Sequence, residues 1–442
     1  MATRGPLAAA LQGALMSPQA LSVAELRAWL RLADAPGLRP AVLRVLLDAF
    51  GSPAALLDAP DDALAAASSP AAAQAVRDSL RDDLDARTDA TLAWLDAPGN
   101  RIVTFGDPAY PPRLLDLHDP PPLLYVKGRV ALLHARSIAI VGSRHATPQG
   151  LADATHFARV LADAGLAIIS GLALGIDGAA HRGGLDGRSG TIAVIGTGAD
   201  LVYPARHRAL AHEIAAHGAI VSEWPLGTPG RASHFPQRNR LIAALASGVL
   251  VVEAAPRSGS LITARLANEM GRDVFAVPGS IHAPLAHGCH ALIRDGAKLT
   301  ATPDDVLDEY GLSEWSRGAP GNAETDAATA IGSSAGVGAD ADAGPNLASV
   351  TDTNSPADGG TRPSATPALC GKTEQLVLAA LGYDPVTYEW LAEHTGLSDD
   401  ALHCALLALE LAGRVASVPG GRFARLDAAA TPPARGVLHS RA

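Results

Sequence analysis

Polar and small residues that suit a phosphate group are concentrated in the segment 234–279. The segment begins with Arg238-Asn239-Arg240, within a stretch expected to be helical over residues 237–246. A continuous apolar run at 249–254 then predicts a strand that is covered on both faces. The turn Arg257-Ser258-Gly259-Ser260 follows, before a second helix. The order helix, strand, turn, helix is typical of a phosphate-binding region.

The Gly/Ser turn stands where that second helix begins, near Leu261. Free backbone N–H groups and the positive end of the helix dipole at such a turn favour a bound phosphate. Alternatively, the hydroxyl of Ser258 or Ser260 only caps the helix. The local sequence leaves both interpretations open.

The length and composition set outer bounds on the protein class. A chain of 442 residues is expected to form two or three domains. Its three cysteines, Cys289, Cys370 and Cys404, cannot form a disulfide framework, which favours a reducing cytoplasm. The N-terminus lacks a signal pattern, and the chain has no apolar run of about 18 residues. We therefore expect a cytoplasmic protein with no membrane partner.

The acidic residues are unevenly distributed. The chain has a net charge of −10, but residues 53–96 contain nine acidic and three basic side chains. Residues 313–369 contain seven acidic and two basic side chains. The rest of the chain therefore has a net charge of +1, which permits a basic surface on the middle domain.

Residues 20–97 are expected to form an N-terminal helical domain of SAM or helix-hairpin-helix type. The phrase Ala35-Pro-Gly-Leu-Arg-Pro40, followed by an apolar helix, resembles a helix-hairpin-helix turn. Such a turn can hold a DNA phosphate on backbone N–H groups, or the module can only pack and bind protein.

Strands and helices alternate through residues 98–312, which predicts an α/β domain with a doubly wound parallel sheet. Strands are expected at Arg101–Phe105, Leu123–Val126, Ser137–Val141, Ala167–Ser170, Thr191–Ile195 and Ala219–Ser222, and helices at Ala152–Ala164, Asp177–Gly184 and Ala205–Ala216. Strands are followed by small-residue turns such as Gly142-Ser143-Arg144 and Ser170-Gly171. Since carboxyl ends of parallel strands share one edge, these turns should converge on one surface.

Residues 313–369 lack periodicity and are expected to form a disordered linker, and residues 427–442 a disordered tail. Between them, residues 370–426 predict three helices and a hairpin, which is the pattern of a winged-helix domain. Winged helices bind DNA or protein. The acidic residues on its helices favour protein here: Glu389, Glu393, Asp399, Asp400 and Glu410.

Other motifs do not predict a cofactor. Gly196-Thr-Gly198 lacks the third glycine of a dinucleotide fingerprint, because Leu201 stands there. Gly371-Lys-Thr lacks the earlier glycine of a phosphate-binding loop. The histidine-rich segment with His282, His287, Cys289 and His290 is expected to be a surface loop, with a metal site as the alternative.

No catalytic arrangement is evident. Asp177 and His181 stand four residues apart, which permits an acid–base pair, but a local contact at the helix start is the simpler reading. The remaining polar inventory consists of arginines, serines and glycines that hold phosphates. We therefore expect a binding surface and not an enzyme.

Several phrases together resemble the DNA-processing protein A family (DprA, also called Smf). They are VGSRHATPQG, SGLALGIDGAAH, IGTGADLVYPARH, SEWPLGTPGRASHFPQRNRLIAAL, VVEAAPRSGSLITARLANEMGRDVFAVPG and HALIRDGA, in family order between Arg101 and Tyr310. The resemblance implies an extended Rossmann-like fold and a homodimer. It further implies a protein that binds and protects single-stranded DNA during natural transformation (competence) and loads the RecA recombinase onto it for recombination. No catalytic activity and no cofactor are implied.

The family's pocket uses the arginine of its GSR motif, here Arg144, and its FPxRNR segment. The Ser-Gly-Ser turn fits the same pocket. With the turn residues of the sheet, the expected DNA-binding set is Ser143, Arg144, Ser170, Gly171, Arg206, Phe235, Arg238, Asn239, Arg240, Ser258, Gly259 and Ser260. Two departures lie beside it: His207 and Cys289-His290 replace residues more usual in the family.

Two other classes remain as alternatives. Nucleotide-binding Rossmann enzymes of phosphoribohydrolase type also place a phosphate loop at a helix start. They carry a PGGxGTxxE signature, whose glycine pair and glutamate are missing from the segment that begins at Ala255. The other alternative is an adaptor that works through the winged helix.

Overall fold

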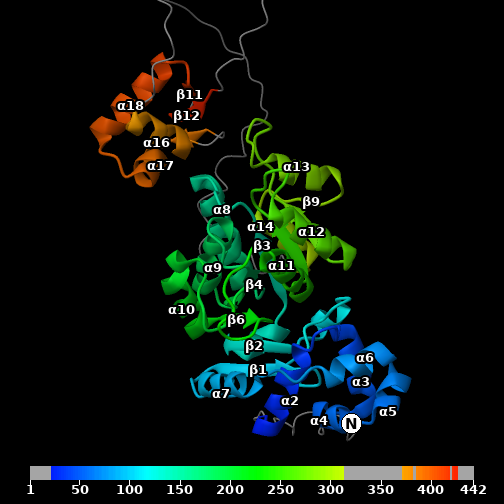
Figure 1. Ribbon diagram of the computed structural model, residues 1–442. Coiled ribbons are helices and arrows are strands. Elements are labelled where there is room, and N and C mark those ends of the chain that lie inside the picture. Colours follow the sequence, from blue (N-terminus) through cyan, green and yellow to red (C-terminus); the bar gives the residue numbers. More distant parts are fainter. Residues whose placement is uncertain (1–20, 313–370, 382–384, 419–420, 427–442) are drawn as a thin grey trace, which may run out of the picture.

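The computed structural model describes residues 21–312, 371–381, 385–418 and 421–426 (Figure 1). The segments expected to be disordered, residues 1–20, 313–369 and 427–442, lie outside the described residues. Within the described ranges, none of the helices has the length and apolar character that crossing a bilayer requires.

Six short helices form the N-terminal part: α2 (Val23–Ala33), α3 (Pro40–Phe50), α4 (Pro53–Asp58), α5 (Asp61–Ala67), α6 (Pro70–Arg77) and α7 (Leu84–Leu95). Serine caps begin three of them, and Ser52 and Ser69 are each followed by a proline at the first helical position. Leu26, Trp29 and Leu30 of α2 pack with residues of the first two strands of the sheet. The helical part is thereby joined to the central domain by apolar contact.

The central domain is built on a sheet of nine strands: β1 (Asn100–Thr104), β2 (Leu123–Gly128), β3 (Ser137–Val141), β4 (Ala167–Ser170), β5 (Thr191–Val194), β6 (Ala219–Ser222), β7 (Gly248–Val251), β8 (Asp273–Ala276) and β9 (Lys298–Leu299). The spatial order is β1-β2-β6-β5-β4-β3-β7-β8-β9. Strands β3 to β9 are parallel, which confirms the doubly wound sheet. Strands β1 and β2 add an antiparallel edge.

The central helices are α8 (Pro148–Asp163), α9 (Ile176–Asp186), α10 (Arg208–His217), α11 (His234–Leu245), α12 (Gly259–Glu269), α13 (His287–Arg294) and α14 (Pro303–Glu309). Short 3₁₀ turns are η1 (Pro112–Asp116), η2 (Val130–His134) and η3 (Ala205–His207).

Both faces of the sheet are covered, as Figure 1 shows by the helices on its two sides. Strand β3 illustrates the reason, because all five of its residues are buried. Ala139 and Val141 pack with residues of α11 and α12, whereas Ile138 and Ile140 pack with residues of α8 and α9. The uninterrupted apolar character of the strand follows from this burial on two sides.

The histidine-rich segment is only partly a loop, which corrects the sequence-based expectation. His287, Cys289 and His290 lie in α13, and the Cys289 side chain is fully buried beneath the sheet's end. Cys289 is within 3.6 Å of the carbonyl oxygens of Val251 and Val252. Burial raises the pKa of its thiol to about 12. Among the described residues, no three His, Cys, Asp or Glu side chains gather as a candidate metal site.

The C-terminal domain contains α16 (Lys372–Ala380), α17 (Tyr388–Thr395) and α18 (Asp399–Leu411), with strands β10 (Val386–Thr387), β11 (Val415–Val418) and β12 (Arg422–Arg425). The strands form a three-stranded sheet of order β10-β12-β11. Leucines at 378, 391, 402, 406 and 409 form its core. Three helices with a hairpin confirm the winged-helix expectation, and β10 is the added short strand.

Candidate nucleic-acid interface

The first turns of α11 lie over the carboxyl ends of β4 and β5. His234, the first residue of the helix, places its Nδ1 atom 3.1 Å from the carbonyl oxygen of Gly196, just beyond β5. Arg238, one turn later, reaches Gly171, directly after β4. Since helices return antiparallel to the strands they connect, α11 brings its N-terminal side chains to the ligand-binding edge of the sheet.

Arg238 is buried, with only 4% of its surface exposed. Its Nη1 atom lies 3.9 Å from a carboxylate oxygen of Asp177, a residue of α9 that is also buried. Burial raises the pKa of Asp177 and lowers that of Arg238. The Nε atom of Arg238 has no hydrogen-bond partner within the described residues. The guanidinium therefore keeps one buried donor without a partner among the described residues.

Gly171 is required by this arrangement. A Cβ atom at position 171 would overlap the Arg238 guanidinium. The backbone N–H groups of Gly171 and Ala173 donate to Asp177, at 3.1 and 3.3 Å. The loop after β4 thus holds the carboxylate, and the carboxylate in turn holds the arginine.

Above this buried pair, three side chains form a continuous exposed row. The guanidinium carbon of Arg144 lies 5.0 Å from the ring centroid of Phe235. The centroid of Phe235 lies 5.7 Å from that of Tyr203, with the rings tilted by 40°. Arg144 and Tyr203 are exposed and Phe235 is half-buried. A cation beside two aromatic faces can contact both a phosphate and an unstacked base.

The Ser-Gly-Ser turn contacts α11, the helix that contains Phe235. Ser258 is the N-cap of α12, and its hydroxyl accepts a hydrogen bond from the N–H of Ser260 at 3.3 Å. The capping interpretation is therefore confirmed, and phosphate binding at this turn stays a prediction. Asn239 donates to the carbonyl oxygen of Gly259 at 3.3 Å, so α11 and the turn are joined. A Cβ at Gly259 would meet no atom within 4 Å, which leaves the turn open to a ligand.

Four further residues of the expected set differ in exposure: three are buried or paired with other groups, and Arg206 is exposed. The hydroxyl of Ser170 is fully buried and donates to the carbonyl oxygen of Ile140 at 2.6 Å. Ser143 is buried, and its hydroxyl accepts from the N–H of His145. Arg206 is exposed on η3.

Arg240 is the fourth. It forms an ion pair with Glu223 and donates to the carbonyl oxygen of Asp119 at 2.8 Å. Because its guanidinium has these partners beside the N-terminal helices, it stabilises that contact and does not join the exposed row. The cavity there is also lined by Asp34 and Arg87.

Asp177 and His181 do not form an acid–base pair. The Nδ1 of His181 is 2.7 Å from the hydroxyl of Thr191, and its Nε2 accepts from the N–H of Leu172 at 3.2 Å. Burial lowers the pKa of His181 to about 3, so the ring is neutral. Together with the contacts of Asp177, this confirms the reading of local contacts at the helix start. The two side chains position the loop that contains Leu172, whose φ of 57° is unusual for a residue with a side chain.

The first departure, His207, also supports this loop. It is buried, and its Nδ1 lies 3.0 Å from the carbonyl oxygen of Leu172. Sequence reasoning missed two other residues: Tyr203, which extends the aromatic row, and Asp177 as the partner of Arg238. The Tyr-Pro step before η3 was visible, but its proximity to Phe235 arises only from the tertiary fold.

Two family models match the chain. The model described as DNA recombination-mediator protein A matches residues 101–311, and that of the DprA winged helix domain matches residues 361–421. Protein Smf of Escherichia coli (strain K12) is 38% identical over 341 residues, which cover 75% of this chain and 79% of that protein.

The chain was also compared with solved structures. DNA processing protein A from Streptococcus pneumoniae matches with a TM-score of 0.55 and 37% sequence identity, over 66% of this chain and 98% of that chain. DNA processing protein A from Helicobacter pylori, described for its single-stranded DNA binding mode, matches with a TM-score of 0.44 and 31% identity, over 48% of this chain and 95% of that chain.

Proposed function

Because the chain belongs to the DNA recombination-mediator protein A family, we propose that it binds incoming single-stranded DNA during natural transformation, protects it and loads RecA onto it. The observation that supports strand binding most directly is the row Arg144, Phe235 and Tyr203 above the buried Arg238. The proposal includes a homodimer, in which two such rows would hold one strand with avidity.

The chemistry of the row suits an unpaired strand better than a duplex. An exposed arginine neutralises a phosphate without reading sequence. An aromatic face such as that of Phe235 gains its energy from an unstacked base, which duplex DNA keeps inside the helix. The proposal therefore predicts a preference for single strands, little sequence preference, and affinity that falls as salt rises.

We further propose that the protein acts by binding and not by catalysis. The titratable groups of the site have structural partners: Asp177 accepts from two backbone N–H groups, and His181 is a buried neutral ring. Neither side chain is exposed to a substrate. A phosphoribohydrolase activity is the outcome that would oppose this part of the proposal.

The test compares oligo-dT with blunt duplex of equal length, using fluorescence anisotropy across a salt series. Arg144→Ala should weaken oligo-dT binding by roughly 10- to 150-fold, because a hydrogen bond to a charged group contributes about 1.5–3 kcal/mol. Arg159→Ala is the matched control, since Arg159 is an exposed arginine of α8 outside the row.

Equal affinity for duplex and oligo-dT, or an Arg144→Ala protein that binds like the Arg159→Ala control, would contradict the proposal. Release of free base from nucleoside monophosphates, measured on the same protein, would instead favour the phosphoribohydrolase class.

A further inference from the structure

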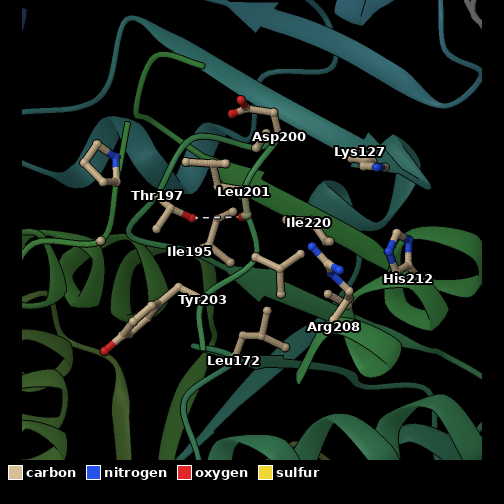
Figure 2. Close-up of a pocket in the computed structure, with 15 residues that line it drawn as sticks. Lys127, Leu172, Ile195, Thr197, Asp200, Leu201, Tyr203, Arg208, His212 and Ile220 are labelled. Carbon is tan, nitrogen blue, oxygen red and sulfur yellow. Dashed lines mark hydrogen bonds between the residues drawn. The ribbon is translucent and has the colours of Figure 1, made fainter. Parts of the chain in front are cut away.

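A cavity of about 500 Å³ lies on the other side of the loop that follows β4. It is open to solvent and is lined by the loop after β5, by α10, and by neighbouring positions of β2 and β6 (Figure 2). Its volume is within the range of small-molecule sites, roughly 300–1,000 Å³. None of the DNA-binding residues expected from the sequence lines this cavity.

One end of the cavity is basic. Lys127, Arg208 and His212 lie together on the right of Figure 2. Within the described part of the chain, none of the three side chains forms a hydrogen bond or an ion pair, although each lines the cavity. Three basic side chains that share a cavity wall without an acidic partner favour an anion such as a phosphate.

The middle of the cavity is apolar. Leu172, Ile195 and Ile220 form its floor, and each is at most 5% exposed as a residue. Lys127 and Ile220 are opposite each other in the antiparallel register of β2 and β6, which places the basic end directly beside the floor. The carboxylate of Asp200, which also lines the cavity, accepts hydrogen bonds from the backbone N–H of Gly227 at 2.9 and 3.0 Å.

The opposite end carries an aromatic ring that the cavity shares with the exposed row. Tyr203 is 53% exposed and lies on the left of Figure 2, away from the basic end. The same ring lies 5.7 Å from Phe235. The loop after β4 is shared in the same way, since Gly171 contacts Arg238 whereas its neighbour Leu172 lines the cavity. Phe235, Tyr203 and the cavity therefore follow one another along this surface.

We propose that this cavity binds one nucleoside monophosphate unit, with the base between Tyr203 and the apolar floor and the phosphate at Lys127, Arg208 and His212. The unit comes either from the single strand bound along the exposed row, in which case the inference rests on the proposed function, or from a free nucleotide. The combination of an aromatic rim, an apolar floor and a basic end matches the three parts of this ligand.

The test uses the full-length protein and a Lys127→Ala/Arg208→Ala variant. The charge-matched control is Arg159→Ala/Arg182→Ala, which removes two exposed arginines outside the cavity and the row. One arm titrates dTMP by calorimetry, with thymidine and inorganic phosphate as partial ligands. The other arm measures binding of a 20-nucleotide oligo-dT across a salt series.

If the unit belongs to the strand, the cavity variant loses oligo-dT affinity on the order of tenfold, and its salt slope becomes shallower by roughly 0.7 for each phosphate no longer neutralised. If the source is a free nucleotide, only dTMP binding is lost. A cavity variant that matches the charge control in both arms overturns the inference. Failure of the wild-type protein to bind oligo-dT refutes the proposed function, and the dTMP arm still decides the cavity.

A second variant separates the cavity from general charge effects. Val202→Phe enlarges a half-buried side chain that lines the cavity and leaves every charge in place. It should reproduce the loss seen with Lys127→Ala/Arg208→Ala, with a melting temperature close to that of the wild type. A folded Val202→Phe protein with unchanged binding in both arms contradicts occupation of the cavity.

Discussion

Gly171→Ala should destabilise the central domain through a single side chain, the guanidinium of Arg238. Position 171 is not among the glycines with positive φ, so its backbone accepts alanine. The added Cβ overlaps the guanidinium, which must leave its place 3.9 Å from Asp177. Separating a buried ion pair costs about 3–5 kcal/mol. Asp177 keeps two backbone N–H donors, so we expect a value near the lower end of that range.

A loss of about 3 kcal/mol should lower the melting temperature of a domain of this size by roughly 6–12 °C. The control is the same substitution in an Arg238→Ala background, where no guanidinium opposes the methyl group. There, Gly171→Ala should be nearly neutral or slightly stabilising, by less than about 1 kcal/mol.

The assay is a double-mutant cycle of four proteins, followed by thermal denaturation monitored by circular dichroism. The interaction of the two substitutions should account for nearly all of the loss caused by Gly171→Ala. If Gly171→Ala lowers the melting temperature equally in both backgrounds, the overlap with Arg238 is not the cause and the reasoning fails.

Two further predictions concern the helical part and the winged helix. Burial raises the pKa of Glu223 to about 7 although Arg240 lies beside it, so the contact with Arg240 becomes a full ion pair only above that pH. At lower pH the folded protein keeps a proton that the unfolded chain has released, so stability should fall as pH rises from about 5 to 7, and Glu223→Gln should flatten that dependence in thermal melts. An unchanged pH dependence would count against it. Truncation after Leu312 should leave oligo-dT affinity within about threefold and the salt slope unaltered. The reason is that the winged-helix domain exposes acidic side chains, which repel DNA phosphates: Glu389, Glu393, Asp399, Asp400 and Glu410. A clearly shallower salt slope for the truncated protein would show that this domain binds DNA.

The sheet was predictable because its central strands are buried on two sides. The strands at 137–141, 167–170 and 219–222 have the predicted bounds. A short continuous apolar run is the pattern of a parallel strand that is buried on both faces. The start of α11 was placed three residues too late. Pro236 lies in the first turn of the helix, where proline is tolerated because the N–H groups there have no partner within the helix. Helix α13 was missed because glycine and histidines obscure its apolar face.

The candidate site was predictable in its residue types and not in their directions. Arg238, Asn239 and Arg240 were treated as one polar cluster. Because successive residues of a helix point about 100° apart, one of these side chains is buried beside Asp177, one reaches the Ser-Gly-Ser turn and one faces Glu223. The contact between Phe235 and Tyr203 joins residues 32 positions apart in the sequence, and no local sequence pattern predicts it.

Arg238, Asn239 and Arg240 of α11 point in three different directions, and this has a consequence for genetics. Alleles that alter neighbouring codons of this helix should fall into different phenotypic classes, although the three residues are adjacent and all polar. Loss of Arg240 should reduce the amount of protein in the cell, because its contacts with Glu223 and the carbonyl oxygen of Asp119 support the N-terminal part. Loss of Asn239 should leave abundance intact and alter only the loop it holds. A screen of such alleles should therefore record the protein level beside each measurement of DNA binding.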